Sequence, residues 1–418
     1  MSVFKGPIRV SANGRHFTCT DGEPFFWLGD TAWPLFSGYT REEAEMYLTN
    51  RAAKGFTVIQ AVLTWSGGTG MEGHRPLPNR YGDEPWCDGD PSRPNEDFFR
   101  HVEYLLAFAA ERGLVLAVLP TWGYFVNDAR IIHAGNARAY GRWLGERFRH
   151  TPNLVWINGG DRAPNGFEDV YRELARGLRE GDEGRHLITY HPCGWRSSSQ
   201  FFHDEDWLDF NMSQTWTEWT KVYPFVHADY CLTPIKPVVL GEGAYENGPE
   251  YPRGPITPLV VRRQAWWTLL AGGFHTYGQN QMWRMEPGWI DTLDTPGAES
   301  LSVLARIVTG LPWWDFIPDQ SVFAAVCGEG MLNAAVRTRN NEAVLIYLSG
   351  RCTVFVYPDK IAAPRLRATW YDPRTGEIKD AGEYETANLP TGLGPAPPLP
   401  YFTTPDFWED AVLLLAAT

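Results

Sequence analysis

The chain of 418 residues has few of the features that mark several common protein classes. Its six cysteines are scattered and form no Cys-x-x-Cys pair, so we expect neither a disulfide framework nor a zinc cluster. It has 37 Lys and Arg against 50 Asp and Glu, and a net charge of −13 disfavours nucleic acid as a partner. No apolar run is long enough to cross a bilayer, so we expect no membrane partner.

Several catalytic and cofactor motifs are also missing. The chain has no phosphate-binding P-loop, no His-Glu-x-x-His and no Gly-x-Ser-x-Gly. No spacing of His, Cys, Asp or Glu resembles a ligand set, so we predict neither a metal nor another cofactor. The first residues, Met1–Pro7, lack the apolar core of a secretion signal, and with thiols taken to be reduced we expect a cytoplasmic protein.

Tryptophan, in contrast, is abundant, with 19 copies. An indole offers a flat apolar face and one N–H donor, which suits stacking on the C–H faces of sugars. Most of these rings are expected to be structural, because large aromatic side chains are buried in most folds. The excess nevertheless favours a carbohydrate partner, and homo-oligomer formation stays open.

A regular alternation of strand-like and helical segments begins near residue 25. Eight apolar runs are predicted as buried strands: Phe25–Gly29, Phe56–Leu63, Leu114–Leu119, Leu154–Asn158, His186–Tyr190, Asp209–Ser213, Pro237–Leu240 and Gly273–Tyr277. Helical patterns lie between most of them: Thr40–Lys54, Asn95–Arg112, Asn136–Arg149, Phe167–Glu180 and Thr257–Leu270. No clear long helix appears between Gly194 and Pro237. Eight alternations predict an α/β fold, a (β/α)8 TIM barrel over residues 1–318, preceded by an N-terminal β-hairpin that turns at Asn13-Gly14.

From about Asp319 the pattern changes to short, alternating strands separated by turns. The predicted strands are Val322–Val326, Leu332–Arg337, Ala343–Leu348, Thr353–Tyr357, Arg365–Tyr371 and Ala411–Leu415. Residues 319–418 are therefore predicted to form a separate antiparallel β-sandwich.

Two carboxylates each follow an apolar run and glycine. Asp161 ends Asn158-Gly-Gly-Asp161, and Glu242 ends Leu240-Gly-Glu242, after the fourth and seventh predicted strands. In a TIM barrel the working residues lie at the carboxyl ends of the strands, so both acids are expected at one mouth. Cleavage of a glycosidic bond needs two such carboxyl groups, and their separation decides between retention and inversion. The sequence leaves that separation open, and Asp161 could instead cap a helix.

Other polar and aromatic residues also stand at predicted strand ends. A carboxylate, imidazole or amide there could hold sugar hydroxyls, and an indole could stack on a sugar ring, although each could also be structural. The expected substrate contacts are Asp30, Trp33, Trp65, Trp122, His191, Gln214, Trp216 and Gln279, and Trp283 is a further candidate for stacking on a sugar.

Four segments together resemble the apiosidase-like glycoside hydrolases. They are Phe26-Trp-Leu-Gly-Asp-Thr-Ala-Trp33, Trp156-Ile-Asn-Gly-Gly-Asp161, Leu240-Gly-Glu242 and Trp370-Tyr-Asp-Pro-Arg-Thr-Gly-Glu377. Members of this family carry a DUF4038-type (β/α)8 catalytic domain followed by a β-sandwich labelled collagen-binding, and the resemblance covers nearly the whole chain. It implies Asp161 as general acid/base and Glu242 as nucleophile. Related barrel glycosidases usually have Asn-Glu after the fourth strand, where this chain has an aspartate.

The expected function is therefore that of a cofactor-free glycoside hydrolase that cleaves a terminal bond in plant-derived oligosaccharides or glycosides. Two alternatives stay open. One is a carbohydrate-binding protein that has kept the cleft without catalysis, and the other is a metal-dependent hydrolase or isomerase on the same barrel.

Overall fold

The computed structural model describes residues 6–67, 75–248, 254–357, 360–385 and 399–418. Contacts between residues divide the chain into two units. The first comprises Met1–Ile256 and Phe274–Thr295, and the second comprises Thr257–Gly273 and Pro296–Thr418. The domain boundary between residues 318 and 319 stays a prediction. Over the described ranges, no helix combines the length and the apolar character that a membrane crossing requires.

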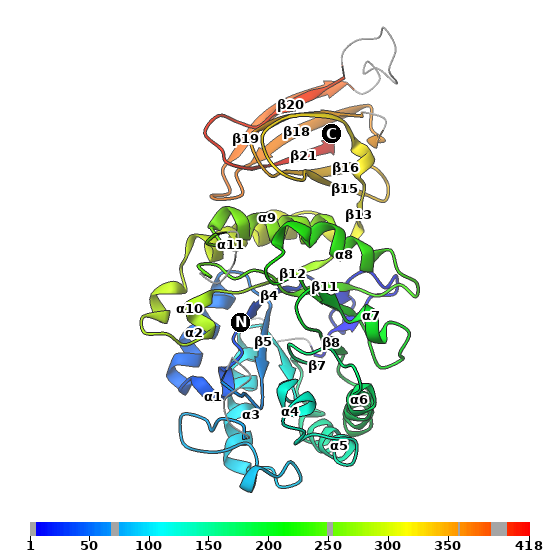
Figure 1. The fold of residues 1–418 in the computed structure, drawn as a ribbon. Helices are drawn as coiled ribbons and strands as arrows, with labels where there is room; N and C mark the ends of the chain where they lie inside the picture. The colour runs from blue at the N-terminus through cyan, green and yellow to red at the C-terminus, as the bar shows by residue number, and fades with distance from the viewer. Residues whose placement is uncertain (1–5, 68–74, 249–253, 358–359, 386–398) are drawn as a thin grey trace. The chain divides into compact units, whose positions relative to one another are not determined.

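The first unit is built on a nearly closed barrel of parallel strands (Figure 1). Its eight strands are β4 (Leu28–Thr31), β5 (Val58–Val62), β6 (Val115–Leu119), β7 (Leu154–Gly159), β8 (Ile188–His191), β10 (Asn211–Gln214), β11 (Val238–Glu242) and β12 (Phe274–Tyr277). Neighbours pair in the order β8-β7-β6-β5-β4-β12-β11-β10, and the short β9 (Arg196–Ser197) adds an antiparallel edge to β10. Between β8 and β10, where the ring of paired strands is open, the backbone N of Asp209 donates to the backbone O of Ile188 at 2.9 Å. The predicted TIM-barrel fold is confirmed.

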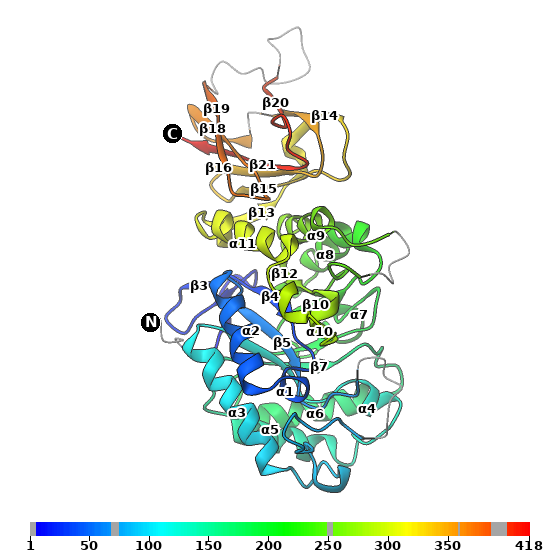
Figure 2. The same ribbon diagram turned by 90° about the vertical axis from the view of Figure 1, so that its left-hand side faces the viewer.

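Helices and an N-terminal sheet complete this unit. The sheet consists of β1 (Arg9–Val10), β2 (Phe17–Thr18) and β3 (Pro24–Phe25). The helices are α1 (Leu35–Gly38), α2 (Arg41–Ala53), α3 (Glu96–Glu111), α4 (Tyr124–Asn127), α5 (Ala137–Phe148), α6 (Glu168–Asp182), α7 (Ser199–Phe202), α8 (Val222–Tyr230) and α10 (Asn280–Trp283). Figure 2 shows α2 and α3 side by side. A capping box begins α2, in which Thr40 and Glu43 each accept a hydrogen bond from the other's backbone N–H. The sequence did not predict α8, which is short and contains Pro224.

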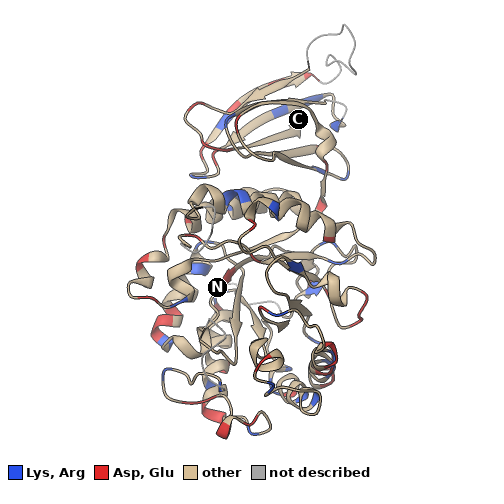
Figure 3. Ribbon diagram, in the orientation of Figure 1, with Lys and Arg blue, Asp and Glu red and all other residues tan. Residues whose placement is uncertain are grey.

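Charged side chains are rare on the barrel strands, which are drawn almost entirely tan in Figure 3. Of the Asp, Glu, Lys and Arg residues that the structure describes, only Asp30 on β4 and Glu242 on β11 lie on the eight parallel strands. A carboxylate in such an apolar environment needs a partner or a function, because burial penalises its ionised form. Asp30 has a buried ion-pair partner, Arg51, whereas Glu242 faces a cavity.

The second unit contains α9 (Pro258–Leu270), α11 (Pro296–Thr309) and two antiparallel sheets. The larger sheet has the order β13 (Phe316–Pro318), β15 (Ala334–Thr338), β16 (Ala343–Leu348), β21 (Ala411–Ala417), β18 (Arg365–Tyr371) and β19 (Ile378–Glu385). The smaller has the order β14 (Phe323–Gly328), β17 (Cys352–Val356) and β20 (Tyr401–Thr403). Buried side chains of both sheets form one core, which confirms the predicted sandwich. Within this unit, Arg262 of α9 is ion-paired with Asp410 at 2.9 Å.

Candidate active site

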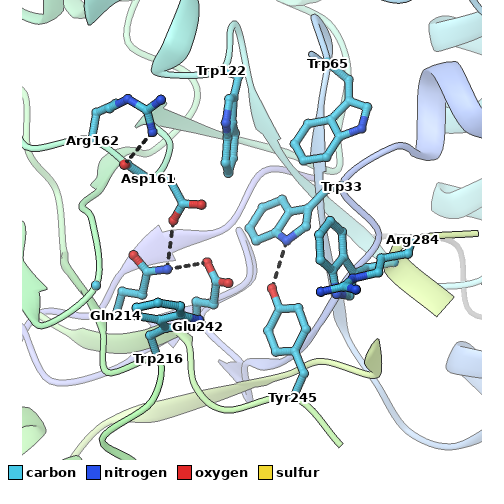
Figure 4. A pocket seen from close by; sticks show the side chains of 12 residues that line it. Trp33, Trp65, Trp122, Asp161, Arg162, Gln214, Trp216, Glu242, Tyr245 and Arg284 are labelled. Carbon is cyan, nitrogen blue, oxygen red and sulfur yellow. Dashed lines mark hydrogen bonds between the residues drawn. The ribbon is translucent and has the colours of Figure 1, made fainter. Parts of the chain in front are cut away.

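A cavity of about 350 Å³ opens at the carboxyl ends of the barrel strands (Figure 4). This volume lies near the lower end of the range typical of small-molecule sites. Its walls are Trp33, Trp65, Trp122, Asp161, Arg162, Gly194, Gln214, Trp216, Glu242, Tyr245, Trp283 and Arg284. Asp161 and Glu242, eighty-one positions apart in the sequence, therefore meet in one pocket, as the barrel topology predicts.

Asp161 reaches the cavity through a tight turn that follows β7. Gly159, Gly160 and Asp161 have φ angles of +89°, +111° and +52° in succession. A Cβ atom at Gly160 would lie 2.5 Å from the Trp122 ring, and one at Gly159 would lie 2.3 Å from the backbone O of His191. Only glycine fits these two positions, so the Gly-Gly pair is what lets the chain present Asp161 beside Trp122.

Glu242 is placed by an irregularity between β10 and β11. In the pairing of these strands, Ser213 lies opposite Leu240 and Gln214 lies opposite Glu242, so Gly241 is passed over. A bulge of this kind changes where the following side chains point. The backbone O of Gly241 accepts a 2.7 Å hydrogen bond from Gln60 Nε2 inside the barrel. The bulge therefore aligns Gln214 and Glu242 side by side.

Gln214 joins the two acids. Its Nε2 donates to Asp161 Oδ1 at 2.8 Å and to Glu242 Oε2 at 2.8 Å (Figure 4). Because both partners are carboxylates, which accept, the amide nitrogen must be the atom that faces them. One oxygen of Asp161 and one of Glu242 lie within 4.8 Å of each other. A single amide thus fixes the separation of the carboxyl groups.

His191 supports Glu242 from behind the cavity. It is fully buried, its Nδ1 donates to Pro192 O at 2.9 Å, and its Nε2 lies 3.2 Å from Glu242 Oε2. Although burial lowers the pKa of His191, the hydrogen bond and charge of Glu242 raise it above the usual value. Burial raises the pKa of Glu242, the charge of Asp161 raises it further, and hydrogen bonds from His191 and Tyr245 lower it only in part.

Five of the 19 tryptophans line the cavity. Trp33, Trp65 and Trp122 are buried, and the Trp122 ring contacts the other two, with ring centroids 5.6 Å from Trp33 and 5.0 Å from Trp65. Trp33 Nε1 donates to Tyr245 OH at 2.8 Å. Trp216 is 43% exposed at the rim. The cavity therefore combines apolar ring faces with two acids, the combination that suits a sugar.

Four cavity residues were not predicted from the sequence: Arg162, Gly194, Tyr245 and Arg284. Each lies within three positions of a residue that was singled out, namely Asp161, His191, Glu242 or Trp283. Closeness in sequence to a predicted site residue could therefore have identified them, because loops that follow barrel strands contribute several neighbouring side chains to one mouth. Arg162 also holds its loop, with Nε 2.7 Å from Asp128 Oδ2.

Asp30 and Gln279 differ from their expected roles. Neither lines the cavity. Asp30 lies inside β4, where it is fully buried and accepts from Tyr47 OH at 2.8 Å and Arg51 Nε at 2.5 Å. Gln279 Oε1 accepts from Met282 N at 2.7 Å and caps α10. Both side chains are hydrogen-bonded to other parts of the fold outside the cavity, and His191 contacts Glu242 where a hydroxyl contact was expected.

The structural role of Asp30 can be tested by substitution. Asp30→Ala leaves the buried guanidinium of Arg51 without its carboxylate, so we expect the free energy of unfolding to fall by about 3–5 kcal/mol. The KM of the folded variant should not change. Asp294→Ala is the matched control, because the Asp294 side chain is 67% exposed and its ion pair with Lys54 should contribute at most about 1 kcal/mol. Urea denaturation measures the free energy of unfolding, and steady-state kinetics measure KM. A KM that rises while the stability stays the same would contradict this role of Asp30.

Asp161, His191 and Glu242 could also offer ligands to a metal ion, because one donor atom from each lies within 4.8 Å of the others. The Gln214 amide nitrogen, however, is hydrogen-bonded to both carboxylates, and an N–H donor cannot ligate a cation. A metal would need this amide to turn. The contacts fit a hydrogen-bonded pair of acids better than a ligand set.

Comparisons with known proteins agree with this chemistry. The family model described as "Apiosidase-like, catalytic domain" matches residues 11–315, and the one described as "Putative collagen-binding domain of a collagenase" matches residues 317–415. No curated protein matches the chain.

Solved structures are similar over nearly the whole chain. A crystal structure of a glycoside hydrolase family 5 protein from Bacteroides vulgatus is 28% identical with a TM-score of 0.88, covering 99% of this chain and 93% of that one. A second structure, described as a glycoside hydrolase, is 29% identical with a TM-score of 0.87, covering 99% and 97%. The acid pair, the sugar-sized cavity and these matches lead to one conclusion: the chain belongs to the apiosidase-like family and is a glycoside hydrolase.

Proposed function

We propose that this enzyme is a retaining glycosidase, with Glu242 as nucleophile and Asp161 as general acid/base, that acts on terminal bonds of plant-derived oligosaccharides or glycosides. The observation that carries the mechanism is the spacing of the acids, whose nearest oxygens lie within 4.8 Å and share one amide donor. Retaining enzymes hold their carboxyl groups roughly 5–5.5 Å apart, and inverting enzymes roughly 6.5–9.5 Å apart to admit a water. The family match supports the substrate class.

In the first step, Glu242 forms a bond from its carboxylate oxygen to the anomeric carbon. The bond from that carbon to the leaving oxygen breaks, and the proton of Asp161 moves to the leaving oxygen. In the second step, ionised Asp161 takes a proton from water, the water oxygen attacks the anomeric carbon, and Glu242 is released. Asp161 suits the role that needs water, because it is only half-buried, whereas Glu242 is 8% exposed.

A nucleophile must be ionised, yet burial and the charge of Asp161 raise the pKa of Glu242. The contact with His191 opposes this rise. Because His191 Nδ1 donates a hydrogen bond to Pro192 O, only its Nε2 can interact with Glu242. This nitrogen either donates a proton to the hydrogen bond with Glu242 or accepts one from it. The contact raises the pKa of His191 and lowers that of Glu242, so it acts toward a proton on His191 Nε2 and an ionised Glu242. His191 is therefore a positioning residue that keeps the nucleophile charged.

A pair of substitutions tests this role of His191. His191→Asn keeps a donor near the Nδ1 position and loses the contact with Glu242, so the pKa of Glu242 should rise further. Since the reaction needs ionised Glu242, the acidic limb of the kcat/KM profile should then move to higher pH. His191→Gln places a donor near the Nε2 position and should shift the limb less. An acidic limb that is unmoved in His191→Asn would contradict the assignment.

Removal of metal ions separates this mechanism from a metal-dependent one. Because Gln214 bridges the acids through a donor nitrogen, we expect dialysis against EDTA to leave kcat and KM unchanged. Added Zn²⁺ or Mn²⁺ should not raise the activity of the dialysed enzyme. A loss of activity that metal restores would favour the metal-dependent alternative.

The proposed function is tested with a panel of nitrophenyl glycosides that includes pentofuranosides such as apiosides. Release of nitrophenol identifies the sugar, and NMR of the first-formed product identifies its anomer. Retention of the substrate's anomeric configuration is expected. Binding of sugars without hydrolysis would favour the carbohydrate-binding alternative, and inversion would exclude Glu242 as nucleophile.

A further inference from the structure

The second unit carries a surface that the proposed reaction does not use. It is the outer face of the smaller sheet, which consists of β14, β17 and β20 (Figure 2 labels β14 and β20). The inner face belongs to the core of the sandwich, where Val354 of β17 and Phe402 of β20 are buried. Because successive side chains of a strand point to opposite faces, the neighbours of these two residues point outward. They are Thr353, Phe355, Tyr401 and Thr403.

The strand register arranges the outward side chains in two rows that cross the sheet. One row joins Ala325, Phe355 and Tyr401, and the next joins Cys327, Thr353 and Thr403. In the first row, the rings of Phe355 and Tyr401 have centroids 5.7 Å apart. In the second row, the hydroxyl oxygens of Thr353 and Thr403 are hydrogen-bonded at 2.8 Å. A pair of aromatic rings therefore lies next to a pair of hydroxyl groups on one face.

This face is uncharged, unlike the outer face of the larger sheet. Over their described lengths, β14, β17 and β20 contain no Asp, Glu, Lys or Arg. On the larger sheet, Arg365 and Arg367 of β18 are exposed and ion-paired with Glu385 and Asp380 of β19. Such pairs are usual on a sheet face that contacts only water. In a chain of net charge −13, an exposed sheet face without charge indicates contact with an uncharged partner.

The two aromatic rings are available to that partner. Tyr401 is 59% exposed, and Phe355 beside it is half-buried. Contact with Phe355 restricts the Tyr401 ring, so less conformational freedom is lost when a ligand stacks on it. Aromatic rings stack on the C–H faces of sugars, and threonine hydroxyls exchange hydrogen bonds with sugar hydroxyls. The face therefore has the chemistry that a neutral glycan needs, and it lacks the Lys and Arg that nucleic acid needs.

We propose that the outer face of the smaller sheet is a second carbohydrate site, which binds a neutral glycan chain of several sugar units. A glycan is the occupant that the activity of the chain favours, because a glycoside hydrolase encounters such chains when it meets its substrate. No residue of β14, β17 or β20 lines the catalytic cavity, so this binding is separate from catalysis. Retention on a glycan raises the concentration of the enzyme near the bonds that it cleaves.

Affinity gel electrophoresis of the full-length enzyme tests the proposal, with mixed-linkage β-glucan, galactomannan or arabinan in the gel. At least one of these neutral polysaccharides should retard the wild type. Tyr401→Ala should raise the dissociation constant for that polysaccharide by at least about fivefold, because it removes the most exposed ring of the face. Tyr401→Trp keeps a ring and should restore most of the retardation. Phe407→Ala is the matched control, since this aromatic residue is 89% exposed in the same unit but lies outside the three strands.

Activity measurements separate this site from the catalytic cavity. Tyr401→Ala should leave kcat/KM for a nitrophenyl glycoside unchanged, because Tyr401 does not line the cavity. The exposed position of Tyr401 also means that its truncation should not prevent folding. Glu242→Gln should be retarded as strongly as the wild type although it hydrolyses nothing, so the second site is measurable even if the proposed reaction is wrong.

Three results would overturn the proposal. The first is that none of the three polysaccharides retards the enzyme, or that each retards wild type and Tyr401→Ala equally. The second is retardation by gelatin alone, which would assign the face to a protein ligand. The third is a dimer in light scattering that Tyr401→Ala converts to a monomer, which would assign the face to a second copy of the chain.

Discussion

Glu242→Ala is expected to lower kcat by at least about 10⁴-fold, the scale of loss found when a covalent nucleophile is removed. The substitution leaves space beside the anomeric carbon, so azide should restore turnover of an activated glycoside. The product should then be a glycosyl azide of inverted configuration, because azide attacks once from the face that Glu242 occupied. Steady-state kinetics and NMR of the azide product measure both effects.

Azide rescue also separates loss of catalysis from loss of folding, because only a folded variant can be rescued. Burial raises the pKa of Glu242, so its removal relieves a cost of burying the carboxylate, but it also takes away the partner of His191. Thermal unfolding of Glu242→Ala measures the net change in stability. Glu173→Ala is a control, since that residue lies on α6 and is ion-paired with Arg176 outside the cavity. Near-normal turnover in Glu242→Ala would contradict the assignment.

Asp161→Asn is expected to lower kcat/KM by about 10²–10⁴-fold for a glycoside with a poor leaving group. The loss should be much smaller for a dinitrophenyl glycoside, whose leaving group departs without a proton. Asparagine is the sharpest replacement here, because it tolerates the φ of +52° and can still accept from Gln214 Nε2. A comparison of kcat/KM across leaving groups of different pKa measures this dependence.

Asp128→Asn serves as the control for this experiment. Asp128 is ion-paired with Arg162 and lies outside the cavity, so its loss should change kcat/KM only slightly and equally for all leaving groups. If kcat/KM of Asp161→Asn falls by the same factor for every leaving group, the lost side chain is not the proton donor. The acid/base role of Asp161 would then have to be abandoned.

Much of the fold could be predicted from the sequence, because each barrel strand is a short apolar run that ends at a turn or polar residue. The first strand was predicted as Phe25–Gly29, whereas β4 spans Leu28–Thr31. The misplacement matters, since it puts Asp30 inside the strand and not after it. Its partner Arg51 is 21 residues away on α2, and no local pattern shows that a helix will direct a buried arginine at that acid. The edge strand β19 was missed because it is mostly exposed and polar.

The pair of acids could also be predicted, because topology alone brings the ends of parallel strands to one mouth. The contacts between them could not. Gln214 was expected at the site, but its bridge to both acids depends on a bulge that the sequence does not display. Tyr245, three positions after Glu242, was overlooked because its neighbouring residues form no motif.

The most direct test of the account is to trap the covalent intermediate. Wild-type enzyme is incubated with the activated 2-deoxy-2-fluoro derivative of the accepted sugar, digested, and analysed by mass spectrometry of its peptides. We expect one glycosyl group per chain, attached to Glu242, with Asp161→Asn still labelled and Glu242→Ala unlabelled. A label on any other residue, or no label together with an inverted product, would contradict the claim that Asp161 and Glu242 act as a retaining pair across one cavity.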